Sequence, residues 1–156
     1  MSFLTNPAKL KLGEKAPKIN AVDETGTAIH LADYYQKGPT LIYFYPKADT
    51  PGCTKQACGL RDSFASLQAR GLQIIGVSND KPVSQKKFKE KHKLPFLLLA
   101  DHAGEVAKAF GVPTIFGFAK RQSFLVDNGK IVWSDLSVSA STHVSNVNDA
   151  LDALNK

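Results

Sequence analysis

The sequence has few cysteines and no long run of apolar residues. Only two of its 156 residues are cysteine, whereas small secreted domains that depend on disulfides are dense in that residue. No stretch is apolar over the roughly 20 residues that a membrane span needs, and residues 1–9 lack the apolar core of a signal peptide. We therefore expect a cytoplasmic protein with no membrane segment.

Several ligand-binding motifs are also missing. No strand-like run is followed by Gly-x-Gly-x-x-Gly, so a dinucleotide-binding Rossmann fold has no support. The four histidines are scattered without a metal-ligand spacing, and the four residues between the two cysteines do not make a zinc signature. His143 is expected in a loop before the last helix. We predict neither a bound metal nor a cofactor.

The length and charge are those of one ordinary globular domain. A chain of 156 residues with 43% apolar content can bury a stable core without disulfides, so we expect a single domain over residues 1–156, acting as a monomer. The net charge of +6 owes much to a Lys-rich stretch at 86–93, which is typical of a solvated helix face. Because no nucleic-acid motif accompanies it, we expect no nucleic-acid partner.

Strand and helix patterns alternate along the chain. A hairpin is expected at 17–31, with its turn at 23–26. Further strands are expected at 40–45, 72–77, 96–100, 122–126 and 130–133. Helices are expected from about Pro51 to Arg70, at 83–91, at 104–110 and over the final residues from Val144 to Leu154. This order predicts an α/β, thioredoxin-like fold with a mixed central sheet flanked by helices and an N-terminal hairpin.

The segment from Pro46 to Cys53 joins the first central strand to the long helix. Thr50 suits the N-cap, where its hydroxyl could accept a hydrogen bond from a first-turn amide, and Pro51 suits the first helical position. Cys53 then falls in the first turn, where free amides and the helix dipole favour the thiolate, the reactive form. A buried, inert cysteine is the alternative, but Thr-Pro-Gly before Cys53 favours a reactive one.

Cys58 lies five residues after Cys53 on the same predicted helix. On an ideal helix this offset separates the two Cα atoms by roughly 8–9 Å, whereas a disulfide needs them within about 7 Å. A bond between the two cysteines therefore requires the helix to unwind, which would make oxidation a conformational switch. Taken alone, Cys58 could also be a small buried apolar residue.

The residues around Cys53 carry a specific resemblance. Pro46-x-x-x-Thr50-x-x-Cys53 is similar to the active-site motif of peroxiredoxins, and its extension to Ala57-Cys58 resembles the bacterioferritin comigratory protein and peroxiredoxin Q branch. The likeness covers nearly the whole chain and includes Leu12-Gly13-x-x-Ala16-Pro17, Gly76-Val77-Ser78 and Arg121-x-Ser123-Phe124-Leu125-Val126-Asp127.

This resemblance implies roles for five residues. Cys53 would be the peroxidatic cysteine, Cys58 the resolving cysteine and Thr50 the hydroxyl that contacts the peroxide, while Pro46 would shield the thiolate and Arg121 would stabilise it. It further implies reduction of hydrogen peroxide and organic hydroperoxides through a sulfenic acid and an intramolecular disulfide. Thioredoxin or a similar dithiol would reopen that disulfide, and no metal, haem or flavin would take part.

Three alternatives remain open at this point. A thioredoxin-like disulfide oxidoreductase would normally carry Cys-x-x-Cys, whereas four residues separate the cysteines here. A redox-sensing or chaperone-like domain without enzymatic activity could use the same pair. Arg121 could be a surface salt-bridge partner. In addition, residues 113–118 differ from the branch that the sequence resembles, so the resemblance does not predict which residues line the substrate pocket.

Overall fold

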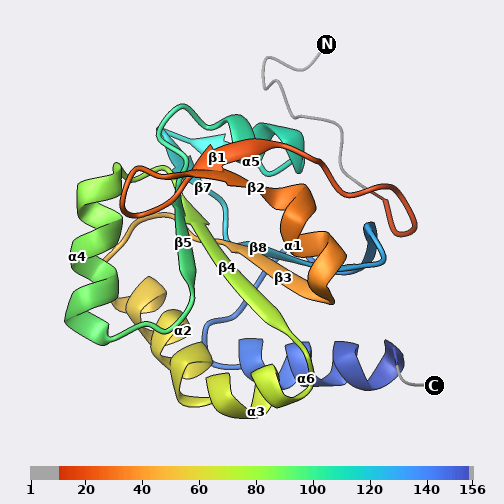
Figure 1. The fold of residues 1–156 in the computed structure, drawn as a ribbon. Coiled ribbons are helices and arrows are strands. Elements are labelled where there is room, and N and C mark those ends of the chain that lie inside the picture. The colour runs from red at the N-terminus through yellow and green to blue at the C-terminus, as the bar shows by residue number, and fades with distance from the viewer. Residues whose placement is uncertain (1–10, 155–156) are drawn as a thin grey trace.

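The computed structural model describes residues 11–154. A five-stranded mixed sheet in the order β5-β4-β3-β8-β9 forms its centre, accompanied by two small two-stranded sheets (Figure 1). Within the described range, none of the helices combines the length and apolar character needed to cross a membrane. The predicted absence of a signal peptide at 1–9 and the outer ends of the predicted domain 1–156 lie outside the described residues.

The bounds of the elements follow the sequence patterns closely in most places. The strands are β1 (Asn20–Val22), β2 (Ala28–His30), β3 (Thr40–Phe44), β4 (Gln73–Ser78), β5 (Leu97–Ala100), β6 (Thr114–Ile115), β7 (Phe118–Ala119), β8 (Gln122–Asp127) and β9 (Lys130–Asp135). The helices are α1 (Leu31–Lys37), α2 (Pro51–Asp62), α3 (Phe64–Ala69), α4 (Pro82–His92), α5 (Glu105–Ala109) and α6 (His143–Leu154).

Strand β3 is the centre of the sheet, and all five of its residues are buried. It pairs in parallel with β4 and antiparallel with β8, so it has a neighbour on each edge. Because successive side chains of a strand point to opposite faces, Leu41 and Tyr43 join one hydrophobic cluster while Ile42 and Phe44 join another. A run that is apolar on both faces is what such a central position requires.

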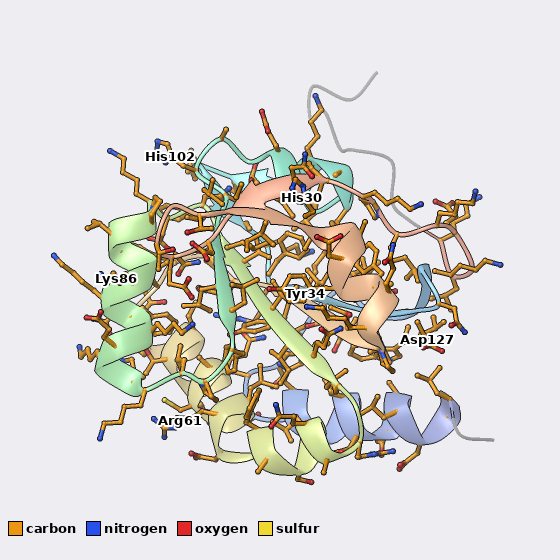
Figure 2. The ribbon with its side chains drawn as sticks, in the orientation of Figure 1. His30, Tyr34, Arg61, Lys86, His102 and Asp127 are labelled. Atoms are coloured by element: carbon orange, nitrogen blue, oxygen red, sulfur yellow. The ribbon has the colours of Figure 1, made fainter. Side chains whose placement is uncertain are left out.

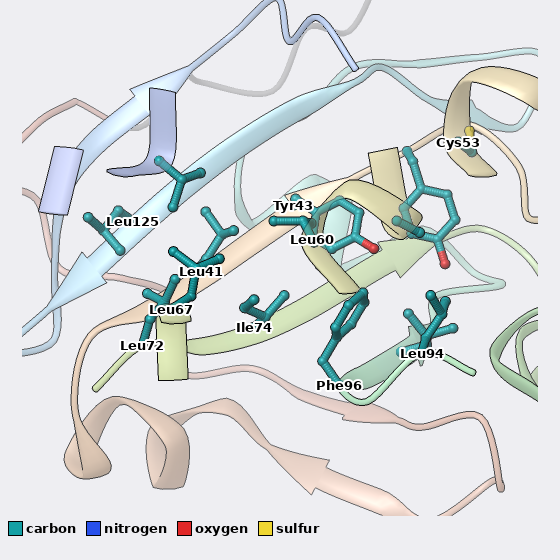
Figure 3. Close-up of a cluster of buried hydrophobic side chains, with 14 of the residues drawn as sticks. Leu41, Tyr43, Cys53, Leu60, Leu67, Leu72, Ile74, Leu94, Phe96 and Leu125 are labelled. Carbon is teal, nitrogen blue, oxygen red and sulfur yellow. The ribbon is translucent and has the colours of Figure 1, made fainter. Parts of the chain in front are cut away.

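Helices cover both faces of the sheet. The Leu41 face packs against α2, α3, α4 and α6, and Figure 3 shows Leu60, Leu67 and Phe96 in this cluster with Cys53 at its edge. The opposite face packs against α1, α5 and the β1–β2 hairpin (Figure 1). The Lys-rich stretch lies on α4, where Lys86 points to solvent, as expected for a solvated helix face (Figure 2).

The predicted mixed sheet, its flanking helices and the N-terminal hairpin are confirmed, with three differences of detail. The predicted long helix is divided at Ser63, whose φ of −100° and ψ of 4° depart from helical values and separate α2 from α3. Helix α1 was not predicted, although Leu31 and Tyr35 have helical spacing and are both buried. The β6–β7 hairpin was also missed because each of its strands has only two residues.

The prediction that His143 lies in a loop is wrong. His143 is the first residue of α6 and is completely buried, with its ring 5.7 Å from that of Tyr43. Burial lowers the pKa of His143 from 6.5 to about 4, so the imidazole is neutral in the folded protein at neutral pH. The positive charge of Arg121 acts in the same direction, and the negative charge of Asp135 acts against it.

This buried histidine predicts acid sensitivity of the fold. Between pH 6.5 and about 4 the unfolded chain protonates His143 and the folded chain does not, so the free energy of unfolding falls as the pH falls. The size of this effect is on the order of 3 kcal/mol. Urea unfolding of wild-type protein and of His143→Asn across this range measures it. The difference in the free energy of unfolding between wild type and His143→Asn should change with pH. The control His102→Asn, at an exposed histidine, should differ from wild type by a constant amount across the same range. Parallel curves for His143→Asn would contradict the prediction.

Candidate active site

The site lies where β3 ends and α2 begins, and the loop between them is tied to two neighbouring elements. The backbone amide of Ala48 donates to Asp80 Oδ2 at 2.7 Å, just after β4. Asp49, which has a positive φ of 61°, forms an ion pair with Lys91 of α4 at 2.9 Å. Pro46 and Thr50 thereby come to the carboxyl edge of the sheet, where ligand sites of α/β proteins commonly lie.

The start of α2 matches the predicted backbone arrangement but not the predicted cap. Thr50 is the N-cap residue with extended backbone, Pro51 is the first helical residue, and the Thr54 amide donates to the Thr50 carbonyl at 2.8 Å. The Thr50 hydroxyl, however, donates to the carbonyl of Lys47 at 2.8 Å and caps no first-turn amide. Its hydrogen is therefore engaged in the loop, and its oxygen remains able to accept a hydrogen bond.

Cys53 lies in the first turn of α2 directly against Arg121. Its side chain is 1% exposed, and its Sγ accepts a hydrogen bond from Arg121 Nη2 at 3.3 Å. Arg121 immediately precedes β8 and is half-buried. A Cβ on Gly52 would stand 3.0 Å from the same Nη2, so the glycine makes room for the guanidinium. Among residues 11–154 Arg121 forms no ion pair, which disfavours the surface salt-bridge alternative.

Sequence reasoning missed the side chains behind Arg121. Arg121 Nη1 donates to Gln56 Oε1 at 2.5 Å, Gln56 Nε2 lies 3.2 Å from His143 Nδ1, and His143 Nε2 lies 2.7 Å from Ser123 Oγ. Gln56, Ser123 and His143 are all completely buried. Gln56 could have been found, because it lies three residues after Cys53 and so shares its helix face. No pattern in the sequence pointed to His143, which comes from a distant helix.

Cys58 lies on the same uninterrupted helix as Cys53. Helix α2 runs from Pro51 to Asp62, and both thiols are free. Cys58 is half-buried, whereas Cys53 is buried. The structure thus has the two cysteines five residues apart on one helix, as the sequence predicted, and not in disulfide contact.

An apolar cavity opens beside the site. It has a volume of about 510 Å³, and its wall includes Pro46 and Arg121 together with the apolar side chains of Pro113, Ile115, Phe118 and Leu136. Pro46 is half-buried at this position. The β6–β7 hairpin therefore contributes much of the wall, and this is the segment in which the sequence departs from the branch it resembles.

The described part of the chain contains no cluster of three or more histidine, cysteine or acidic side chains that could hold a metal ion. Its buried carboxylates are used in local structure instead. Asp101 accepts from the backbone amides of Val106 and Ala107 at the start of α5, and burial raises its pKa. Asp23 accepts from the amides of Thr25 and Thr27 in the first hairpin turn.

Known proteins share both the sequence and the fold. The AhpC/TSA family model matches residues 12–134. Peroxiredoxin Bcp of Escherichia coli (strain K12) is 43% identical over 140 residues, which cover 83% of this chain and 89% of that protein. Chloroplastic Peroxiredoxin Q of Oryza sativa subsp. japonica is 42% identical over 126 residues, covering 80% of this chain but only 58% of the rice protein.

A solved structure supports the same grouping. The crystal structure of Peroxidoxin BcpB from Mycobacterium tuberculosis superimposes with a TM-score of 0.87 at 33% sequence identity, covering 92% of this chain and 97% of that one. The fold is therefore the thioredoxin-like fold of peroxiredoxins, as the sequence predicted. With its family match, its relatives and its cysteine motif at the start of α2, the chain belongs to the AhpC/TSA family and, within it, to the peroxiredoxins of the Bcp/PrxQ type.

Proposed function

We propose that the protein is a thiol-dependent peroxidase that reduces hydrogen peroxide and organic hydroperoxides through oxidation of Cys53. The observation that carries the proposal is the buried Cys53 sulfur in the first turn of α2, 3.3 Å from the Arg121 guanidinium. A helix N-terminus and a cation both favour the thiolate over the thiol. The sulfur therefore has the electrostatic environment that a nucleophile needs.

In the first step the Cys53 thiolate attacks the terminal oxygen of the peroxide. An S–O bond forms, the O–O bond breaks, and the leaving hydroxide or alkoxide takes up a proton to become water or an alcohol. Arg121 and the Cys53 amide, which has no intrahelical acceptor at this position, donate to the oxygens as charge develops. The Thr50 oxygen accepts from the peroxide O–H, because its own hydrogen is donated to Lys47.

In the second step Cys58 resolves the sulfenic acid. Its sulfur attacks the Cys53 sulfur, water leaves, and an intramolecular disulfide forms. Because the two residues are separated by more than a disulfide permits while α2 is intact, the first turns of α2 must open. Thioredoxin or a similar dithiol then reduces the disulfide. This route needs one chain only, which agrees with the expected monomer in the reducing cytoplasm.

The cavity beside Arg121 supports the inclusion of organic hydroperoxides. Hydrogen peroxide needs only the polar groups around Cys53, whereas an alkyl hydroperoxide must also place an apolar chain. The side chains of Ile115, Phe118 and Leu136 offer apolar surface next to Arg121. Pro46 borders the same cavity and would limit the access of water to the thiolate.

Replacement of Cys53 by serine tests the proposed function directly. We expect Cys53→Ser to abolish peroxide consumption in the presence of thioredoxin and its reductase, because a hydroxyl cannot replace the thiolate as nucleophile. Peroxide disappearance measured against wild type is the readout. Activity above trace level in the variant would contradict the assignment. Insulin reduction by wild type without peroxide consumption would instead support a thioredoxin-like disulfide oxidoreductase.

Replacement of Cys58 by serine separates attack from resolution. In Cys58→Ser the first turnover should proceed at the wild-type rate, whereas steady-state recycling by thioredoxin should stall, because the described residues contain no other thiol to attack the sulfenic acid. Mass spectrometry should show sulfenic and then sulfinic acid on Cys53 at lower peroxide doses than in wild type. Undiminished turnover with thioredoxin would remove Cys58 from the resolving role.

Removal of the Arg121 side chain should lower the thiolate fraction of Cys53 at neutral pH. We expect Arg121→Ala to shift the midpoint of pH-dependent alkylation upward by about one pH unit or more and to slow peroxide attack, because the nearest cation is lost. Arg70→Ala, which removes an arginine paired with Asp152 on the surface, is the matched control. An unchanged alkylation profile and unchanged peroxide kinetics in Arg121→Ala would show that the contact between Arg121 and Cys53 does not contribute to the reaction.

A further inference from the structure

A chain of hydrogen bonds leads from Cys53 to Ser123 of β8 along the face of the sheet that α2 and α6 cover. It runs from the Cys53 sulfur through Arg121, Gln56 and His143 to Ser123, with donor–acceptor distances of 3.3, 2.5, 3.2 and 2.7 Å in that order. The chain joins the start of α2, the first residues of β8 and the first turn of α6. Peroxide chemistry as derived above uses Cys53 and Arg121 and leaves His143 and Ser123 without a role.

The direction of every bond in this chain follows from its arginine. A guanidinium can only donate, so Gln56 must face Arg121 with its carbonyl oxygen and His143 with its amide nitrogen. That nitrogen can only donate, so His143 Nδ1 must carry no proton and accept. The remaining ring proton is then on Nε2, which donates to Ser123 Oγ. One tautomer of a neutral histidine satisfies the whole chain.

We propose that His143 is a positioning residue for the peroxidatic site. By accepting from the Gln56 amide, it fixes the orientation in which Gln56 presents its oxygen to Arg121, and so holds the guanidinium against the Cys53 sulfur. A Gln56 side chain rotated by half a turn would face Arg121 with its NH₂ group, and two donors would oppose each other. His143 excludes that rotamer as long as its Nδ1 carries no proton and can only accept. This inference rests on the proposed function in one respect: the proposed function gives the contact between Arg121 and Cys53 its role in catalysis.

The surroundings of His143 keep it in the required state. The residue is completely buried beside the Tyr43 ring, and the charged groups that act on it are Arg121 before β8 and Asp135 on β9. Burial and Arg121 both lower its pKa, to about 4, against the opposing influence of Asp135. The Tyr43 hydroxyl makes no hydrogen bond in the described structure and so does not compete for Nδ1.

Two substitutions of His143 separate positioning from packing. Asn places a side-chain oxygen near the position of Nδ1 and can still accept from Gln56, whereas Gln reaches the Nε2 position and can contact Ser123 but leaves the Gln56 amide without its acceptor. The readouts are the pH midpoint of Cys53 alkylation and the single-turnover rate with hydrogen peroxide. We expect His143→Gln to raise the midpoint by about one pH unit and to slow the reaction about tenfold, and His143→Asn to remain close to wild type.

Controls and a double mutant make the result decisive. His102→Gln, at an exposed histidine (Figure 2), should leave both readouts unchanged. In an Arg121→Ala background, His143→Gln should have no further effect on either readout, because its influence passes through Arg121. Equal effects of His143→Asn and His143→Gln, or full additivity with Arg121→Ala, would assign His143 to packing alone and overturn the proposal.

A measurement on wild-type protein guards against variants that do not fold. Nitrogen-15 NMR of the reduced protein at pH 7 should show His143 as the neutral tautomer with its proton on Nε2. In Gln56→Glu, whose carboxylate can only accept, His143 should acquire a proton on Nδ1. The other neutral tautomer, or an imidazolium, in wild type would overturn the proposal. Neither the alkylation assay nor NMR requires turnover. If wild-type protein had no peroxidase activity, the proposed function would be refuted, and the alkylation and NMR results would still test the role of His143.

Discussion

The two cysteines share one helix, and the rest of the site depends on that constraint. While α2 is intact, its first turn holds Cys53 against Arg121, and Gln56 on the same face connects Arg121 to the interior. The same intact helix separates Cys53 from Cys58 by more than a disulfide allows. Attack on a peroxide and formation of the disulfide therefore need different conformations of one segment, and the proposed cycle must alternate between them.

The contacts of α2 are unevenly strong along its length. Ala57 and Leu60 are fully buried against the sheet, whereas the loop before the helix is held partly by the exposed ion pair of Asp49 with Lys91. Exposed ion pairs contribute little to stability, so most of the cost of opening this end comes from exposing Cys53 and Gln56, which are buried in the first turns of α2. In the proposed cycle, opening that reaches Gln56 would also break the Arg121–Gln56 bond, so the chain to His143 would stabilise only the conformation proposed to attack the peroxide. The hydrogen bonds of that chain would then favour the return of α2 to its helical form after reduction.

The sequence predicted the parts of this account that depend on local signals. Thr50, Pro51 and Gly52 predicted the helix start, and the apolar run at 40–45 predicted the central strand. Contacts made by long-range packing could not be read in the same way: the Thr50 hydroxyl bonds to Lys47 and not to its own helix, and His143 reaches the site only because α6 packs against α2. The helix break at Ser63 could not be predicted, because neither proline nor glycine occupies that position. The motifs predicted the candidate reacting groups, whereas the contacts that orient these groups could be seen only in the folded structure.

Amide hydrogen exchange of residues 50–60 in the reduced and oxidised protein tests the central constraint most directly. Stoichiometric peroxide prepares the oxidised form, and mass spectrometry of the same sample establishes whether Cys53 and Cys58 are joined. Because the disulfide cannot form on an intact α2, we predict that this segment loses protection on oxidation, while β3 and β4 remain protected in both states. Equal protection of residues 50–60 in the two redox states would show that α2 does not open, and the intramolecular disulfide would then be excluded.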